Sequence, residues 1–91
     1  MLEIKITPQF KRDLKKIRRQ TRYDISKLEN VVSMLAQEKQ LPAANRDHPL
    51  RGEFSGYREC HIEPDWLLIY KVMEGEVILM LFRTGSHSDL F

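Results

Sequence analysis

Cysteine is almost absent from this sequence of 91 residues, and the only one, Cys60, has no partner for an internal disulfide. Also missing are a run near the roughly 18 consecutive apolar residues of a membrane-spanning helix and the apolar segment of a signal peptide. We therefore expect a protein of the reducing cytoplasm, with no membrane partner, held together by packing alone. A chain of this length builds one small core, so we expect a single domain over residues 1–91 without a large ligand cavity.

Closely spaced metal ligands are absent as well. Structural zinc sites usually use pairs such as CxxC or HxxxH, whereas the three histidines, His48, His61 and His87, are far apart in the sequence. We therefore expect no metal and no cofactor. A zinc site built from the three histidines is a weaker alternative.

Charge is distributed unevenly along the chain. The formal net charge is only +2, but residues 1–24 contain eight lysines and arginines against three acidic residues. The rest of the chain is net acidic, so one end of the molecule should attract polyanions such as nucleic acid. A solvated helix face would give the same pattern.

The first half of the sequence predicts one strand and two helices. Residues 2–6 (LEIKI) alternate in polarity like a short strand, and Thr7 and Pro8 then form a typical N-cap and first helical residue. Asp24 can cap a second helix, which should end by residue 40 because Pro42 follows. The apolar positions of the two helices are Phe10, Leu14 and Ile17 in the first, and Ile25, Leu28, Val31, Val32 and Leu35 in the second.

The second half predicts an antiparallel meander. An irregular connection over residues 41–56 precedes three apolar, aromatic-rich runs at residues 57–62, 66–73 and 77–84. Short turns between these runs force antiparallel neighbours. The sequence therefore predicts an α+β fold: an N-terminal strand, two α-helices, a three-stranded meander and a short C-terminal tail, with the helices packed on a twisted sheet.

The expected hairpin registers suggest a candidate site. With two-residue turns, His61 would face Trp66, and Trp66 would face Arg83, so that all three share one face of the sheet. Asp65 lies beside this row, and His87 follows Arg83 by four residues. A slip of one residue at either turn would reverse the arrangement.

These side chains suit RNA cleavage by the 2′-hydroxyl of the substrate. That reaction needs a general base, a general acid and a cation near the phosphate, which histidine, aspartate and arginine can supply. Histidine, with an ordinary pKa of about 6.5, can act in either proton-transfer role. Structural readings stay open: His61 as a half-buried strand residue, Trp66 as core, and Arg83 paired with Asp65 or Glu63.

Three segments together resemble a known toxin family. DHPL at 47–50, GYRECHIEPDWLLIYK at 56–71 and FRTGSHSDLF at 82–91 resemble the RelE/ParE superfamily, and within it the YafQ branch. The resemblance implies the toxin of a type II toxin–antitoxin system, a ribosome-dependent endoribonuclease that cuts mRNA in the A site. Its implied partners are a cognate antitoxin, the ribosome with its mRNA and ribosomal RNA, and operator DNA through the antitoxin alone.

The resemblance also implies the functional positions His48, His61, Asp65, Trp66, Arg83, His87 and Phe91, and we assign roles to them from their chemistry. His87 would protonate the leaving oxygen, Arg83 would hold the phosphate charge, and either Asp65 or His61 would take or orient the 2′-hydroxyl proton. His48 would bind the phosphate or tune its neighbours. Trp66 and Phe91 would contact the substrate base, and the residues expected to bind ribosomal RNA phosphates are Lys11, Lys15, Lys16, Arg18, Arg19 and Arg22.

Two rival functions remain at this level. ParE-type relatives share the fold but inhibit gyrase by protein binding, without a nuclease site. A plain RNA-binding domain would block the A site and leave messages intact. The three histidines and Asp65 favour the nuclease, because a binding module does not need acid–base groups at one edge.

Overall fold

The computed structural model describes the backbone of residues 1–91 and the side chains of all of them except Glu74. Short 3-10 turns lie at Ala43–Asn45, Gly52–Phe54 and Glu74–Glu76. None of the described helices is long and apolar enough to cross a membrane. The strands and α-helices are, in chain order, β1 (Glu3–Ile6), α1 (Pro8–Arg18), α2 (Ile25–Ala36), β2 (His48–Pro49), β3 (Arg58–Glu63), β4 (Trp66–Met73), β5 (Ile78–Gly85) and α3 (His87–Leu90).

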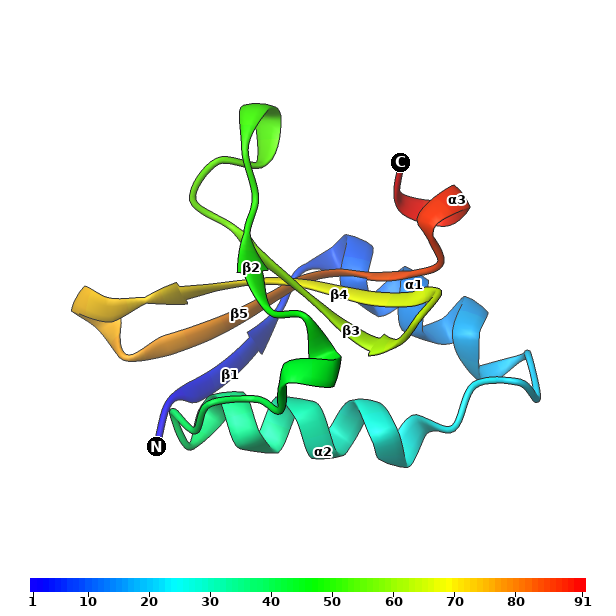
Figure 1. Cartoon of the computed structure of the whole chain (residues 1–91), viewed down its shortest axis with the longest axis horizontal. Helices are drawn as coiled ribbons and strands as arrows, with labels where there is room; N and C mark the ends of the chain where they lie inside the picture. Colours follow the sequence, from blue (N-terminus) through cyan, green and yellow to red (C-terminus); the bar gives the residue numbers. More distant parts are fainter.

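The five strands form one sheet in the order β1-β5-β4-β3-β2. Figure 1 shows α2 beneath the sheet, whereas the loop between β2 and β3 and the C-terminal helix α3 rise on the opposite side. The predicted α+β class is therefore confirmed. The two-residue strand β2, which pairs with β3, was not predicted because it lies in the irregular connection.

Local sequence signals place the ends of both long helices. The Oγ1 atom of Thr7 accepts a hydrogen bond from the backbone N–H of Phe10, and Pro8 begins α1 as predicted. Asp24 caps α2 by accepting from the backbone N–H of Ser26 at 3.0 Å. The second helix ends at Ala36, a few residues before the expected limit.

The expected hairpin registers are wrong at both turns. Residues 74–77 form a longer connection between β4 and β5, so Met73 pairs with Ile78, and a register shift between Ile69 and Tyr70 places Arg83 opposite Ile69. At the other turn Glu63 pairs with Trp66, and His61 pairs with Leu67. The row of His61, Trp66 and Arg83 therefore does not form.

The two faces of the sheet carry different clusters. The larger core lies between the sheet and the helices α1 and α2, and it includes Trp66, Leu68 and Tyr70 from β4. On the opposite face, which we call the open face, Leu67 and Ile69 of β4 form a smaller cluster with Leu90 of α3. This second cluster anchors α3 to the sheet, and it leaves the side chains around it at the surface.

Strand β1 covers only part of the edge of β5. It pairs in parallel with Ile78–Leu81, and its last paired residue is Ile6. The remaining edge of β5, residues 82–85, has α1 beside it instead. This arrangement brings the basic helix next to the segment that leads into α3.

Candidate active site

Three imidazoles form a row that we call the histidine row. The ring of His61 on β3 lies between the rings of His48 on β2 and His87 on α3, with ring centroids 6.3 Å and 5.9 Å away. Residues from three distant segments therefore meet, although the hairpin register expected for them was wrong. The topology of β2, β3 and α3 on the open face brings them together.

A buried carboxylate, Glu59, lies between two of these rings. Its Oε1 atom is 3.6 Å from Nε2 of His48 and 3.6 Å from Nε2 of His61. On the other side of each ring, Nδ1 lies near a backbone carbonyl oxygen, that of Arg46 for His48 and that of Pro64 for His61. Because a carbonyl oxygen only accepts, Nδ1 carries hydrogen in both rings, and Nε2 faces the carboxylate.

Sequence reasoning missed Glu59. The signal was present, because Glu59 precedes His61 by two residues on one strand, and alternate strand residues share a face. His61 is 8% exposed, so it is less accessible than the expected catalytic role suggests. His48 and His87 are exposed at the two ends of the row.

Asp65 holds the third histidine. Its Oδ1 atom accepts from the backbone N–H of His87 at 3.0 Å and from the ring Nδ1 at 3.2 Å. These bonds, the backbone bond first, lower the pKa of Asp65 below its ordinary value. The carboxylate therefore fixes the ring of His87 and leaves Nε2 as the nitrogen available to a substrate.

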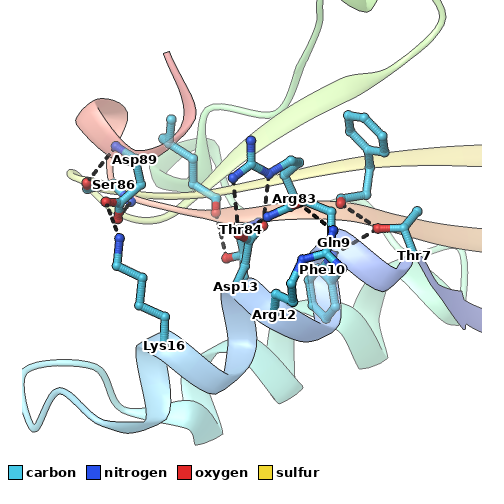
Figure 2. Close-up of polar contacts among 12 residues, drawn as sticks. Thr7, Gln9, Phe10, Arg12, Asp13, Lys16, Arg83, Thr84, Ser86 and Asp89 are labelled. Carbon is cyan, nitrogen blue, oxygen red and sulfur yellow. Dashed lines mark hydrogen bonds and ion pairs between the residues drawn. The ribbon is translucent and has the colours of Figure 1, made fainter.

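Arg83 is held by a carboxylate of α1, not by a residue of the histidine row. Its guanidinium group makes two parallel bonds to the carboxylate of Asp13 on α1, from Nε at 3.0 Å and from Nη2 at 3.1 Å (Figure 2). The pairing with Asp65 or Glu63 considered from the sequence is not the one formed. The Asp13 carboxylate raises the pKa of Arg83, so the group stays charged.

The two residues expected to contact a base differ in exposure. Trp66 is 1% exposed and packs edge-on against Tyr23, while its Nε1 donates to Thr84 Oγ1 at 3.0 Å. The stacking role predicted for Trp66 is therefore wrong in this fold, since its indole belongs to the core under the helices. Phe91 is 61% exposed and remains a candidate.

Phe91 belongs to an aromatic group that continues the histidine row. Its ring centroid lies 6.4 Å from that of His87 and 5.8 Å from that of Phe54. Phe54 contacts Phe82, which packs against Tyr57 at 4.7 Å. Phe54 and Phe82 were not among the predicted site residues, because only the folded loop and the paired strands bring them together.

The six basic residues expected to bind ribosomal RNA all have exposed side chains. Lys16 also forms an ion pair with Asp89 of α3, at 3.1 Å, and the guanidinium group of Arg22 lies over the ring of Tyr23. The set comprises Lys11, Lys15, Lys16, Arg18, Arg19 and Arg22.

Among the described side chains, no three of the types histidine, cysteine, aspartate and glutamate gather in a way that could hold a metal ion. Cys60 is buried, and burial raises the pKa of its thiol to about 12, which makes it a packing residue rather than a nucleophile or ligand. The arrangement suits proton transfer by imidazoles and carboxylates.

Comparison with known proteins shows which family the chain is similar to. The sequence model for the bacterial toxin of type II toxin-antitoxin system, YafQ, matches residues 2–91. The mRNA interferase toxin YafQ of Escherichia coli (strain K12) is 39% identical over 90 residues, covering 98% of this chain and 95% of that protein.

Solved structures agree with the sequence match. A metal-bound toxin from Helicobacter pylori has a TM-score of 0.94 and 43% identity, covering 100% of both chains. A chain of the Escherichia coli DinJ-YafQ complex has a TM-score of 0.89 and 38% identity, covering 100% of this chain and 99% of that one. The present chain therefore belongs to the YafQ family of bacterial toxins of type II toxin–antitoxin systems.

Proposed function

We propose that this protein is a ribosome-dependent endoribonuclease that cuts mRNA in the A site. The observation that carries the proposal is the histidine row, in which His61 lies within 6.3 Å of His48 and 5.9 Å of His87, measured between ring centroids. The name mRNA interferase, given to the Escherichia coli relative, supports the same reaction class. In-line attack by the 2′-hydroxyl needs acid and base groups on both sides of one phosphate, and the row offers them.

In this mechanism His87 is the general acid. Asp65 accepts hydrogen bonds from the backbone and from Nδ1 of His87, which orients the ring and leaves Nε2 to protonate the leaving 5′-oxygen. The lowered pKa of Asp65 keeps it ionised and in place as the orienting group. Both groups considered as the general base keep that candidate role, since Asp65 is engaged by His87 through Oδ1 and Nε2 of His61 faces Glu59.

The remaining groups orient the histidines, bind the RNA and stabilise the transition state. His48 and Glu59 flank His61 and orient its ring, and Arg83 supplies positive charge for the developing phosphorane. Phe91, with Phe54 behind it, offers a platform on which an unpaired base can stack. The exposed cations of α1 bind ribosomal RNA phosphates, which provides affinity without sequence choice.

The partners follow from the same proposal. DinJ is the protein in complex with YafQ in the solved Escherichia coli structure. We infer that a cognate antitoxin binds this chain and neutralises it, and that operator DNA is contacted only through that antitoxin. The ribosome and its mRNA are the cytoplasmic targets.

Primer extension on mRNA from cells that express the protein tests the proposal. We expect new 5′ ends inside the codons of translated messages. His87→Ala should reduce their abundance by about 10²- to 10⁴-fold. Intact messages with inhibited translation would instead indicate a blocking RNA-binding domain. Intact messages with changed DNA supercoiling would indicate a ParE-like inhibitor of gyrase.

Two further measurements test the chemistry. A message with a single 2′-deoxy substitution at the cleaved position should survive, because the attacking hydroxyl is missing. Treating the purified protein with a chelator, and removing the chelator before ribosomes are added with their own Mg²⁺, should leave cleavage unchanged if the protein holds no catalytic metal. A cut at the 2′-deoxy position, or activity that is lost after this treatment and restored by preloading the protein with metal, would contradict this mechanism.

A further inference from the structure

Asp13 is a buried acid in the middle of the basic helix α1. It is 8% exposed, and its two carboxylate oxygens accept four hydrogen bonds. Nε2 of Gln9 donates at 3.0 Å, the backbone N–H of Thr84 at 3.2 Å, and Nε and Nη2 of Arg83 at 3.0 and 3.1 Å. Three of these bonds cross from α1 to β5, over about 70 residues of sequence.

The topology explains why an acid is needed there. Because β1 pairs with β5 only as far as Leu81, the backbone N–H of Thr84 lies at an edge without a neighbouring strand. Asp13 accepts this N–H in place of a strand partner. A carboxylate rather than an amide also balances the charge of Arg83, whose side chain is only 25% exposed.

The same contact leaves one side of Arg83 available. Asp13 engages Nε and Nη2, and Figure 2 shows the third guanidinium nitrogen pointing away from α1. A pocket of about 200 Å³ lies on the α1 side of the group, lined by Asp13 itself together with Arg12, Lys16 and Asp89. The two parallel hydrogen bonds that Arg83 donates to the Asp13 carboxylate restrict the Arg83 side chain, which would otherwise have several rotamers.

A second contact joins α1 to the C-terminal helix α3. Nζ of Lys16 lies 3.1 Å from Oδ1 of Asp89, whose Oδ2 accepts from the backbone N–H of Ser86 and so caps α3. The helix α3 carries His87. The basic helix is therefore tied both to Arg83 and to the segment that holds the general acid.

We propose that Asp13 is a positioning residue of the cleavage reaction, which fixes Arg83 so that its free guanidinium edge meets the scissile phosphate. The inference rests on the proposed function. Asp13 itself touches no substrate, and it acts through Arg83 alone. A displacement of about 1 Å at a reacting group can cost about 100-fold in rate, which sets the scale of the expected effect.

The test compares Asp13→Asn with wild type and with Asp24→Asn. Asp24 caps α2 far along the chain from the site, and asparagine is an equally good N-cap, so this control makes the same chemical change without touching Arg83. Single-turnover cleavage of mRNA on saturating ribosomes gives the rate, and titration with ribosomes gives the Kd. Melting curves give the folded fraction at the assay temperature, by which each rate is divided.

We expect Asp13→Asn to cleave about 10- to 100-fold more slowly, with a Kd that is unchanged or tighter because the basic helix has lost a negative charge. Asp24→Asn should match wild type. In the background Arg83→Ala, adding Asp13→Asn should change the rate no further.

Three outcomes would overturn the inference. One is a cleavage rate for Asp13→Asn equal to that of Asp24→Asn. Another is a weaker Kd with an unchanged rate, which would mean that Asp13 serves only ribosome binding. The third is a further loss in the double variant, which would mean that Asp13 acts on something other than Arg83. If wild type itself leaves mRNA intact, the proposed function fails first, and this inference fails with it.

Discussion

At the scale of single residues, the contact between Asp65 and His87 sets a testable pH dependence. The pKa of Asp65 is lowered from 3.8, mainly by the backbone N–H of His87 and then by its ring. Because the folded-state pKa is depressed, any stability from this contact is present above the ordinary value and is lost as the pH falls through the folded-state pKa. Asp65 therefore remains ionised throughout the neutral range, where the proposed reaction occurs.

The variant His87→Ala separates the two causes of this shift. Alanine keeps the backbone N–H and removes only the ring, so we expect the pKa of Asp65 to rise part of the way toward 3.8. An NMR titration of the side-chain carboxyl carbon measures it, and Ser88→Ala serves as the control from the same helix. A midpoint at 3.8 or above in His87→Ala would show that the backbone bond contributes nothing.

Glu59 provides a second prediction at this scale. It is the only carboxylate that the described ion pairs place against both His48 and His61. We expect Glu59→Gln to slow cleavage by about 10- to 100-fold, because a neutral amide lacks the negative charge that faces Nε2 of both His48 and His61. Single-turnover assays on programmed ribosomes check this, with Glu76→Gln in the β4–β5 connection as control. Equal rates for the two variants would leave Glu59 without a role in orienting the rings.

At the scale of elements, Thr7 links the start of α1 to β5. Its Oγ1 accepts from the backbone N–H of Phe10 and donates to the carbonyl oxygen of Phe82 at 2.8 Å. We expect Thr7→Ala to lower the free energy of unfolding by about 1–2 kcal/mol, since it removes an N-cap. Urea denaturation measures the change, and Thr21→Ala in the exposed turn after α1 is the matched control. A difference between the two below about 0.5 kcal/mol would contradict the capping role.

The elements also show which parts of the fold the sequence could predict. The caps at Thr7 and Asp24 are local, because each involves a residue and the turn that follows it, and both were predicted correctly. The three meander strands were placed within about one residue of the observed ones. The order of β1, α1, α2 and the meander strands was therefore accessible without coordinates, whereas β2 and the short helix α3, expected as an irregular connection and a tail, were not.

Registers and long-range pairs were not accessible in this way. Val77 adopts a positive φ of 56°, unusual for a β-branched residue, and the resulting connection is longer than the two-residue turn assumed. The register shift between Ile69 and Tyr70 changes which residues pair along the rest of β4, so the pairing cannot be counted from the turn alone. The pair of Asp13 with Arg83 joins residues about 70 positions apart, and an acid inside a basic run was its only sequence signal.

At the scale of the whole molecule, the surface proposed to bind the ribosome and the surface proposed to cut mRNA are distinct but joined. The cations of residues 1–24 are concentrated on α1 and the turn after it, whereas the histidine row lies on the open face of the sheet. The contacts of Asp13 with Arg83 and of Lys16 with Asp89 connect the two surfaces. In the proposed function, contacts to ribosomal RNA phosphates set the affinity, whereas the histidine row and the aromatic group contact the mRNA.

This separation predicts that charge removed from α1 changes binding and leaves the chemistry intact. Lys15 and Arg19 are exposed on and just after α1. The double variant Lys15→Gln/Arg19→Gln should weaken ribosome binding and reduce the slope of log K against log salt by about one unit for each phosphate that is no longer neutralised. Lys27→Gln/Lys39→Gln removes the same charge from the region of α2 and should leave that slope unchanged.

The same double variant should leave the chemistry unchanged. Because neither Lys15 nor Arg19 holds Arg83, the rate of Lys15→Gln/Arg19→Gln on saturating ribosomes should equal that of wild type, in contrast to Asp13→Asn. A slower rate at saturation, with an unchanged salt slope, would mean that these cations act on the reaction itself and that the two surfaces are not distinct.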